Sequence, residues 1–164
     1  MINFAFYKSP VGIIKLGFDK SFIYFCDFIP TSQCKKEMLE ELSSTNKISK
    51  ALDNYFAGKF TALNKLKLKV IGTTFQIDTW RALKNIKAGN TASYQEIAKI
   101  INAPKSSRAV GSACNKNPIL LFIPCHRILS SGGKLTGYRP GIKYKKLLLQ
   151  HEKGEKSSKN LAKQ

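Results

Sequence analysis

The most informative segment of this chain runs from Asn117 to Arg127 and reads NPILLFIPCHR. Its five consecutive apolar residues, at 119–123, predict a buried strand that ends at a polar site. There, Cys125 is followed directly by His126 and Arg127. A thiol attacks as the thiolate, and basic or cationic neighbours favour that form. The segment therefore predicts a cysteine nucleophile with an activating partner beside it.

The relative position of Cys125 and His126 determines how the pair can act. Adjacent residues in an extended segment point to opposite faces. We therefore expect His126 to act through a water molecule or through a loop conformation rather than by direct contact. The alternative for any such pair is a buried thiol beside a hydrogen-bonded histidine, with no chemistry. The surrounding motifs favour the nucleophile.

Two short helices are predicted upstream of this segment, across a brief turn. Ser93 and Glu96 have the spacing of a capping box at the start of the first helix. Pro104 interrupts the pattern, and Ser106 or Ser107 begins a second helix that runs to about residue 116. This second helix is basic and carries the small residues Ala109, Gly111, Ser112 and Ala113. The arrangement is typical of a helix-turn-helix.

The first 71 residues predict a small sheet with helices. Strands rich in Ile, Phe and Tyr are expected at 2–6, 13–18 and 22–28, as an antiparallel meander. Helical patterns follow near 36–42 and 48–56. A break at Gly72, with an N-cap candidate after it, places a domain boundary after residue 71. We predict an α+β protein with a small antiparallel-sheet domain at 1–71, a mostly helical domain with the helix-turn-helix at 72–152 and a disordered basic tail at 153–164.

The charge of the chain favours a polyanionic partner. It has 28 Lys and Arg residues against 10 Asp and Glu, a net charge of +18. Such an excess attracts nucleic acid, although Lys is abundant throughout this sequence. No acidic residue lies between positions 97 and 151, where the basic residues are Lys99, Lys105, Arg108, Lys116, Arg127, Lys134, Arg139, Lys143, Lys145 and Lys146. The positive charge therefore gathers around the predicted nucleophile.

The cysteine and hydropathy patterns indicate whether the protein has disulfides or a metal site and where in the cell it is found. The four cysteines, Cys26, Cys34, Cys114 and Cys125, form no C-x-x-C pair, so neither a disulfide framework nor a zinc ribbon is indicated. We predict no metal. The sequence also has no signal-peptide pattern and no apolar run long enough to span a bilayer. We expect a soluble cytoplasmic protein with no membrane partner, beside the nucleoid in a prokaryote or nuclear in a eukaryote.

The motifs of the second half together resemble the O6-alkylguanine-DNA alkyltransferase family (methylated-DNA–protein-cysteine methyltransferase). The mark of that family is a Pro-Cys-His-Arg segment that carries the alkyl-accepting cysteine. Further matching segments, in the family's order, are Phe75-Gln76, Trp80, Gly89 to Tyr94, Ser107 to Gly111, Asn117-Pro118, Gly137-Tyr138 and His151-Glu152. The resemblance is strong over 72–152 and weak over 1–71.

The resemblance implies repair of DNA by direct reversal. Cys125 would displace the alkyl group from O6 of alkylated guanine, and as a further substrate from O4 of alkylated thymine, to form a thioether. No second group is available to remove that thioether. One turnover per molecule and no cofactor are therefore expected.

The resemblance also implies roles for the residues around Cys125. His126 would take the thiol proton through a water molecule and would be oriented by Glu152, which a C-terminal helix brings back to the site. Tyr94 would donate a hydrogen bond to the leaving base, and Asn117 would tie the active-site loop. The pocket for the base would be lined by Tyr138, Arg139 and Cys114.

The implied partner is double-stranded DNA that contains alkylated guanine. In the resembling family the second helix enters the minor groove without sequence preference, and the arginine at the position of Arg108 fills the gap left by a flipped base. Flipping is required in any case, because a thiol cannot reach a base inside the stack. We expect a monomer whose DNA contacts come from Lys105, Ser107, Arg108, Ala109, Gly111, Lys116 and Arg127.

One departure from the family pattern bears on the pocket. Arg139-Pro140 follows Gly137-Tyr138, where the family has smaller residues. A bulky side chain and a proline without an N–H are expected to narrow the pocket or change which alkyl groups fit.

Three other functions remain open from the sequence. The first is a lesion-binding protein without chemistry, but such alkyltransferase-like proteins lack the cysteine that Cys125 supplies here. The second is a transcription regulator, for which no ligand domain is apparent. The third is a cysteine hydrolase, which would need a separate histidine and an oxyanion hole and would leave the basic surface unexplained.

Overall fold

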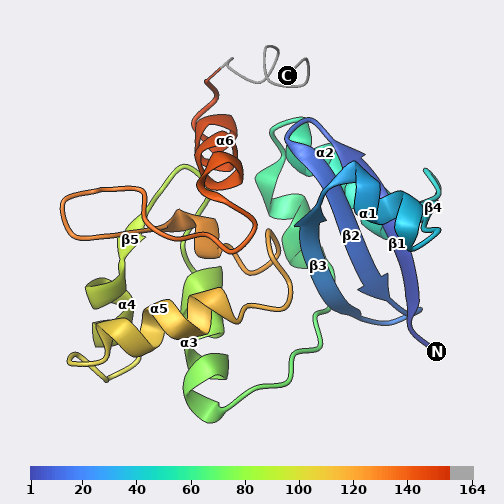
Figure 1. The fold of residues 1–164 in the computed structure, drawn as a ribbon. Coiled ribbons are helices and arrows are strands. Elements are labelled where there is room, and N and C mark those ends of the chain that lie inside the picture. The colour runs from blue at the N-terminus through green and yellow to red at the C-terminus, as the bar shows by residue number, and fades with distance from the viewer. Residues whose placement is uncertain (156–164) are drawn as a thin grey trace.

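The computed structural model describes residues 1–155. The sheet and the helices of the first half lie on the right of the view in Figure 1, and the helices of the second half lie on the left. The last helix lies between the two halves at the top of this view. Buried side chains from both halves form one continuous hydrophobic core. The predicted α+β class is confirmed. The predicted tail falls outside the described residues from position 156 onward.

The sheet of the first half has the strand order β3-β2-β1-β4. Strands β1 (Asn3–Ser9), β2 (Gly12–Phe18) and β3 (Ile23–Ile29) form the predicted antiparallel meander, with limits close to those expected. The prediction of a helix at 36–42 is wrong. A short helix α1 (Thr31–Lys36) ends before it, and the chain turns at Met38, which has a φ of +48°. Strand β4 (Glu40–Glu41) then pairs in parallel with the free edge of β1, whose backbone groups need partners.

Helix α2 (Lys47–Phe56) and the 3₁₀ helix η1 (Phe60–Lys65) complete the first half. The side chain of Asn46 caps α2 by accepting a hydrogen bond from the Ile48 N–H. Tyr7 of β1 stacks on Phe56 and donates a hydrogen bond to Asp53 at 2.7 Å, which fixes α2 against β1. The buried face of the helix places Tyr55 in the core.

Three helices build the second half: α3 (Thr74–Lys84), α4 (Tyr94–Ile100) and α5 (Ser107–Asn115). A capping box at Thr73 starts α3, and the predicted box of Ser93 and Glu96 starts α4. Helices α4 and α5 form the predicted helix-turn-helix. The Trp80 indole N–H donates to the Ala113 carbonyl at 2.9 Å and so holds α5 against α3.

The apolar segment 119–123 is buried as predicted, but it is not a strand. Its hydrogen bonds run to the edge of β3, where the Leu120 N–H donates to the Cys26 carbonyl at 2.9 Å. The chain then reverses sharply. Leu121 has a φ of +73°, and the Phe122 N–H bonds to the Leu120 carbonyl at 2.9 Å across a γ-turn. That conformation is strained for a branched residue and is maintained by the packing around it.

The segment continues into the 3₁₀ helix η2 (Cys125–Arg127) and strand β6 (Ile128–Leu129), which pairs in parallel with β5 (Ala92–Ser93). Helix α6 (Ile142–Glu152) then returns the chain to the junction of the two halves. No helix within residues 1–155 combines the length and the apolar character that crossing a membrane requires.

Candidate active site

Cys125 is the first residue of η2 and is almost fully buried. Asn117 lies beside it, with its side-chain amide donating to Cys125 Sγ at 3.2 Å and to the Ile123 carbonyl at 2.8 Å. The amide oxygen of Asn117 accepts from the Ile119 N–H at 2.9 Å. One buried amide thus holds both ends of the reversed segment and contacts the sulfur.

The environment of Cys125 keeps its thiol protonated. Burial raises the pKa of Cys125 to about 11, although the Asn117 hydrogen bond and the charges of Lys145 and Arg139 act in the opposite direction. Arg127, which follows His126 in the sequence, is not among these charges, because its guanidinium bonds to Glu152. A resting thiol of this kind needs a proton acceptor before it can attack.

His126 is suited to be that acceptor. Burial lowers the pKa of the imidazole below its usual value, and the nearby carboxylate of Glu152 offsets only part of this effect. The ring is therefore neutral at neutral pH. Its Nε2 lies 2.8 Å from Glu152 Oε1, which assigns the ring proton to Nε2. Nδ1 then carries the lone pair and has no hydrogen-bond partner among the described residues.

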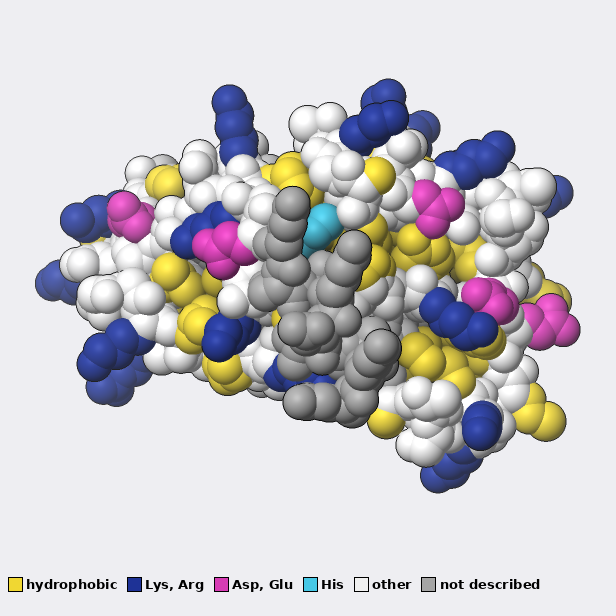
Figure 2. Space-filling model, turned by 90° about the horizontal axis from the view of Figure 1, so that it is seen from above, with side chains coloured by type: hydrophobic (Ala, Val, Ile, Leu, Met, Phe, Trp, Pro, Cys, Tyr) yellow, Lys and Arg dark blue, Asp and Glu magenta, His cyan; other side chains and the backbone are white. Residues whose placement is uncertain are grey.

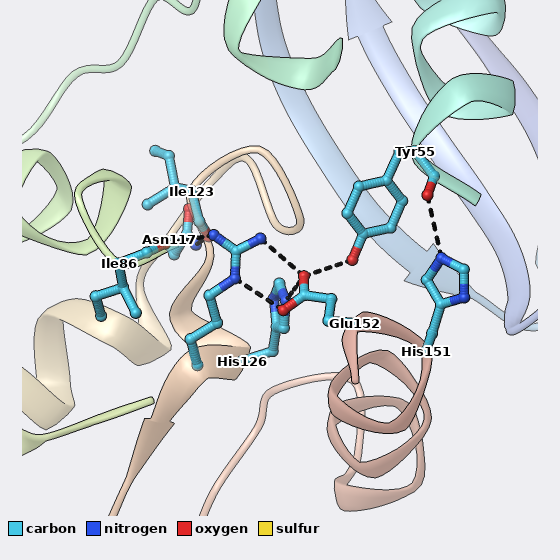
Figure 3. A network of polar contacts seen from close by, with 8 residues as sticks. Tyr55, Ile86, Asn117, Ile123, His126, His151 and Glu152 are labelled. Atoms are coloured by element: carbon cyan, nitrogen blue, oxygen red, sulfur yellow. Dashed lines mark hydrogen bonds and ion pairs between the residues drawn. The ribbon is translucent and has the colours of Figure 1, made fainter. Parts of the chain in front are cut away.

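Glu152, at the end of α6, is the centre of a buried polar network (Figure 3). Its Oε1 accepts from His126, from Arg127 Nη2 at 2.8 Å and from the Tyr55 hydroxyl at 2.6 Å, while Oε2 accepts from Arg127 Nε at 2.9 Å. Burial alone would raise the pKa of this carboxyl, but its bonds with His126 and Arg127 outweigh burial and hold the pKa well below the usual range. Glu152 is thus a permanent anion next to the imidazole.

A small cavity of about 70 Å³ opens beside the sulfur. Its wall includes Cys114 and the loop that precedes α6, and the complete lining is Tyr94, Gly111, Cys114, Asn115, Cys125, Gly137, Tyr138 and Arg139. The Arg139 guanidinium bonds to the Asp27 carboxylate at 3.0 Å and to the carbonyls of Asn115 and Asn117. This contact fixes the pocket loop to both α5 and β3.

A wider hollow of about 360 Å³ lies over α5, next to that cavity. Arg108 is exposed at this hollow, which is lined by Tyr94, Gln95, Ser107, Arg108, Gly111, Ser130 and Ser131. Gly111 lies beside the Tyr94 ring, and a Cβ at position 111 would make an ordinary van der Waals contact with that ring, at 3.6 Å. The predicted contacts Lys105, Ala109 and Lys116 are all exposed around α5. Figure 2, which views the molecule from the side of α6, shows Lys and Arg side chains around the outline with several Asp and Glu side chains among them.

Comparisons with known proteins agree over the whole described chain. A family model for the DNA binding domain of 6-O-methylguanine DNA methyltransferase matches residues 74–154, and a model for its ribonuclease-like domain matches residues 2–70. The chain belongs to the 6-O-methylguanine DNA methyltransferase family.

Individual members of the methyltransferase family match over most of their length. The methylated-DNA–protein-cysteine methyltransferase of Methanosarcina acetivorans is 40% identical over 152 residues, which cover 91% of this chain and 97% of the relative. The crystal structure of Mycobacterium tuberculosis O6-methylguanine methyltransferase has a TM-score of 0.80 at 35% identity, with 94% of each chain covered. A structure of the M. tuberculosis OGT protein in complex with DNA also has a TM-score of 0.80, at 36% identity, with 93% of this chain and 94% of that chain covered.

Within this methyltransferase, the structure brings most of the predicted site residues together. Asn117, His126 and Glu152 surround the nucleophile segment, and Tyr94 lines both the small cavity and the hollow over α5. The lack of direct contact between Cys125 and His126 is confirmed, but the reason given for it is wrong, because the two residues lie on a 3₁₀ turn rather than on an extended strand.

The prediction that Arg127 contacts DNA is wrong. Its side chain is 10% exposed, and its guanidinium bonds to Glu152 and, at 2.6 Å, to the Ile86 carbonyl. Each of its three guanidinium nitrogens makes one of these bonds, and the buried side chain is not presented to a DNA phosphate. In this methyltransferase, Arg127 therefore belongs to the buried network and not to the DNA surface.

Two residues near the site were not identified from the sequence. Tyr55 comes from α2 in the first half, where no motif marked it. Lys145, counted only as surface charge, is fully buried, and its ammonium donates to the carbonyls of Thr136 and Gly137 at 2.9 and 3.3 Å. No sign of this burial is visible in the sequence, because the partners of Lys145 are carbonyl groups of the loop before α6.

Proposed function

We propose that this protein repairs DNA by direct reversal, taking the alkyl group from O6-alkylguanine, or from O4-alkylthymine, onto Cys125 in a single turnover. The observation that carries the proposal is the free lone pair on Nδ1 of a neutral, buried His126 beside a protonated, buried Cys125. The neutral imidazole of His126 can accept the thiol proton at the moment when Cys125 attacks. Membership of the methyltransferase family supports the identity of the substrate.

The proposed step is one displacement at the alkyl carbon. A bond forms from Cys125 Sγ to that carbon while the bond from carbon to O6 breaks, and its electron pair leaves with the guanine. The thiol proton passes through a water molecule to Nδ1 of His126, and the anionic Glu152 stabilises the imidazolium that forms. The guanine leaves as its anion, which accepts a hydrogen bond from Tyr94 and takes up one proton from solvent, while the imidazolium of His126 afterwards releases its proton to solvent. The thioether is stable, so the protein is consumed.

Intact-protein mass measures this outcome directly. After incubation with a duplex that contains one O6-methylguanine, the protein is expected to gain the mass of one methyl group, and no more with excess substrate. Multiple turnovers would contradict the single-use mechanism. Unchanged mass together with retained binding of the lesion would favour a recognition protein instead.

The proposed partner is double-stranded DNA, bound as a monomer in the minor groove without sequence preference. The DNA binding domain model, the exposed cations around α5 and the small residues that allow its backbone to approach support this mode. Arg108 would fill the space of the flipped base.

The division into domains at 1–71 and 72–152 is part of the proposal, and the change of family model between residues 70 and 74 supports it. A cytoplasmic place of action follows from the same proposal.

Replacing Arg108 with alanine is expected to slow methyl uptake from a duplex by about tenfold to a hundredfold, because flipping a base costs a few kcal/mol. Uptake from a single-stranded oligonucleotide with the same lesion should change much less, since that base is not paired. Rates of protein methylation on the two substrates measure the difference. Arg81→Ala is the matched control, because Arg81 is an exposed arginine of α3. Equal losses in both variants would contradict the assignment.

The small cavity beside Cys125 favours a methyl group over a larger alkyl group. We propose that Cys114, Tyr138 and Arg139 line the pocket for the base, and a volume of about 70 Å³ leaves little room for a benzyl ring. O6-Methylguanine is therefore expected to react at least about tenfold faster than O6-benzylguanine, which corresponds to roughly 1.4 kcal/mol in the barrier. Cys114→Ala, which widens the cavity, should narrow this ratio, whereas Cys34→Ala in α1 should leave it unchanged. Equal rates for methyl and benzyl in the wild type would dismiss the size limit.

A further inference from the structure

Tyr55 connects the first half of the chain to the polar network around Cys125. Its side chain is fully buried, and its hydroxyl donates to Glu152 Oε1 at 2.6 Å. Its backbone carbonyl accepts from His151 Nε2 at 3.1 Å, and the His151 ring packs against the Tyr55 ring (Figure 3). A single residue of α2 thus contacts two consecutive residues at the end of α6.

The donors to Glu152 Oε1 differ in what they contribute. His126 and Arg127 are neighbours on η2, so any movement of η2 carries both of them. Tyr55 is the donor from outside η2 and α6, and it is uncharged, so it fixes the position of the carboxylate without an ion pair. Three donors share the charge of this one oxygen, so each bond is weaker than it would be without the other two.

We propose that the Tyr55 hydroxyl is a positioning group of the alkyl-transfer site: it holds Oε1 of Glu152 and thereby sets how strongly Glu152 binds the ring of His126. This inference rests on the proposed function. It gives the first half of the chain a direct part in the reaction, in addition to its part in the core.

The expected effect of removing the hydroxyl has a definite sign. The charged and titratable groups that face His126 are Glu152 and Lys145 from α6, Arg127 from η2 and Tyr55 from α2. Without the tyrosine donor, more of the carboxylate charge is available to the imidazolium form of His126. The pKa of His126 then rises toward its usual value, and the ring loses its capacity to accept the thiol proton at a higher pH than in the wild type.

Tyr55→Phe tests the proposal, because phenylalanine keeps the ring contacts with Phe56, Phe60 and His151 and removes only the hydroxyl. The acid limb of the pH profile of single-turnover methyl uptake is expected to move upward by about half a pH unit or more, with a loss of rate of about threefold near that limb. Tyr7→Phe is the matched control. Tyr7 also donates to a carboxylate, that of Asp53 in the same helix, at 2.7 Å, but it does not contact Glu152.

Titration of the imidazoles by NMR supplies a second measurement that does not depend on catalysis. The chain has two histidines, so the resonance that disappears in His151→Gln belongs to His151 and the other belongs to His126. His126 should titrate at a higher pH in Tyr55→Phe than in the wild type.

An unchanged pH profile and unchanged His126 titration in Tyr55→Phe would overturn the inference. The same shift in Tyr7→Phe would overturn it as well, because it would show a general loss of stability in the first half. If the wild type takes up no methyl group, the proposed function fails, and the NMR titration alone then decides the role of Tyr55.

Discussion

Replacing Cys125 with serine is expected to abolish methyl uptake while leaving DNA binding intact. Serine has nearly the same shape and can keep the hydrogen bond from Asn117. However, an alcohol is a far weaker acid than a thiol, and a neutral imidazole cannot deprotonate it to a useful extent. Intact mass after incubation with a duplex that contains O6-methylguanine should show one added methyl group for the wild type and none for the variant.

Cys114→Ser is the appropriate control, because Cys114 lines the same cavity. Burial raises the pKa of the Cys114 thiol, and no hydrogen bond to its sulfur is recorded among the described residues. It should therefore retain methyl uptake. Loss of uptake in Cys114→Ser, with retention in Cys125→Ser, would show that Cys114 is the acceptor and would contradict the proposal.

Replacing Glu152 with alanine is expected to destabilise the fold by about 3–5 kcal/mol, because it leaves the buried guanidinium of Arg127 without its partner. Methyl uptake should fall as well, since the tautomer of His126 is no longer fixed. Urea unfolding at neutral pH measures the first effect. Glu41→Ala, which removes an exposed carboxylate paired with Lys8, should cost about 1 kcal/mol or less.

The same carboxylate predicts how stability depends on pH. Its pKa is lowered in the folded state from an ordinary value of 4.5, so its stabilising effect is complete above that pH and is lost as the pH falls below it. Wild-type stability should therefore decline as the solution is acidified below about pH 4.5, and Glu152→Gln should lack that component of the decline. Identical acid profiles for the two proteins would show that Glu152 is not the linked group.

Local signals in the sequence were sufficient for most of the secondary structure. The capping box of Ser93 and Glu96 and the break at Pro104 define the helix-turn-helix, because each acts within a few residues. Segments rich in Ile, Phe and Tyr similarly located the three strands of the meander. The helix predicted at 36–42 failed because the free edge of β1 captured Glu40 and Glu41, a tertiary effect that periodicity does not record.

The site was predicted where its residues lie in the matched motifs and missed where contacts span the chain. Motifs located Cys125, His126 and Glu152 but gave no sign of Tyr55, which contacts Glu152 across 97 positions. Arg127 was misassigned because a cation beside a nucleophile in a basic chain favours a surface role. Only its distance to Glu152 shows that it neutralises a buried carboxylate.

The position of Glu152 has a consequence for how the protein is made. A ribosome synthesises the thiol of Cys125 and its neighbours well before the last turn of α6, which carries the carboxylate that joins Tyr55, His126 and Arg127. A nascent chain that ends before residue 152 thus contains the nucleophile but not the group that orients its base. We therefore expect a chain without residue 152 to take up methyl groups more slowly than the finished protein.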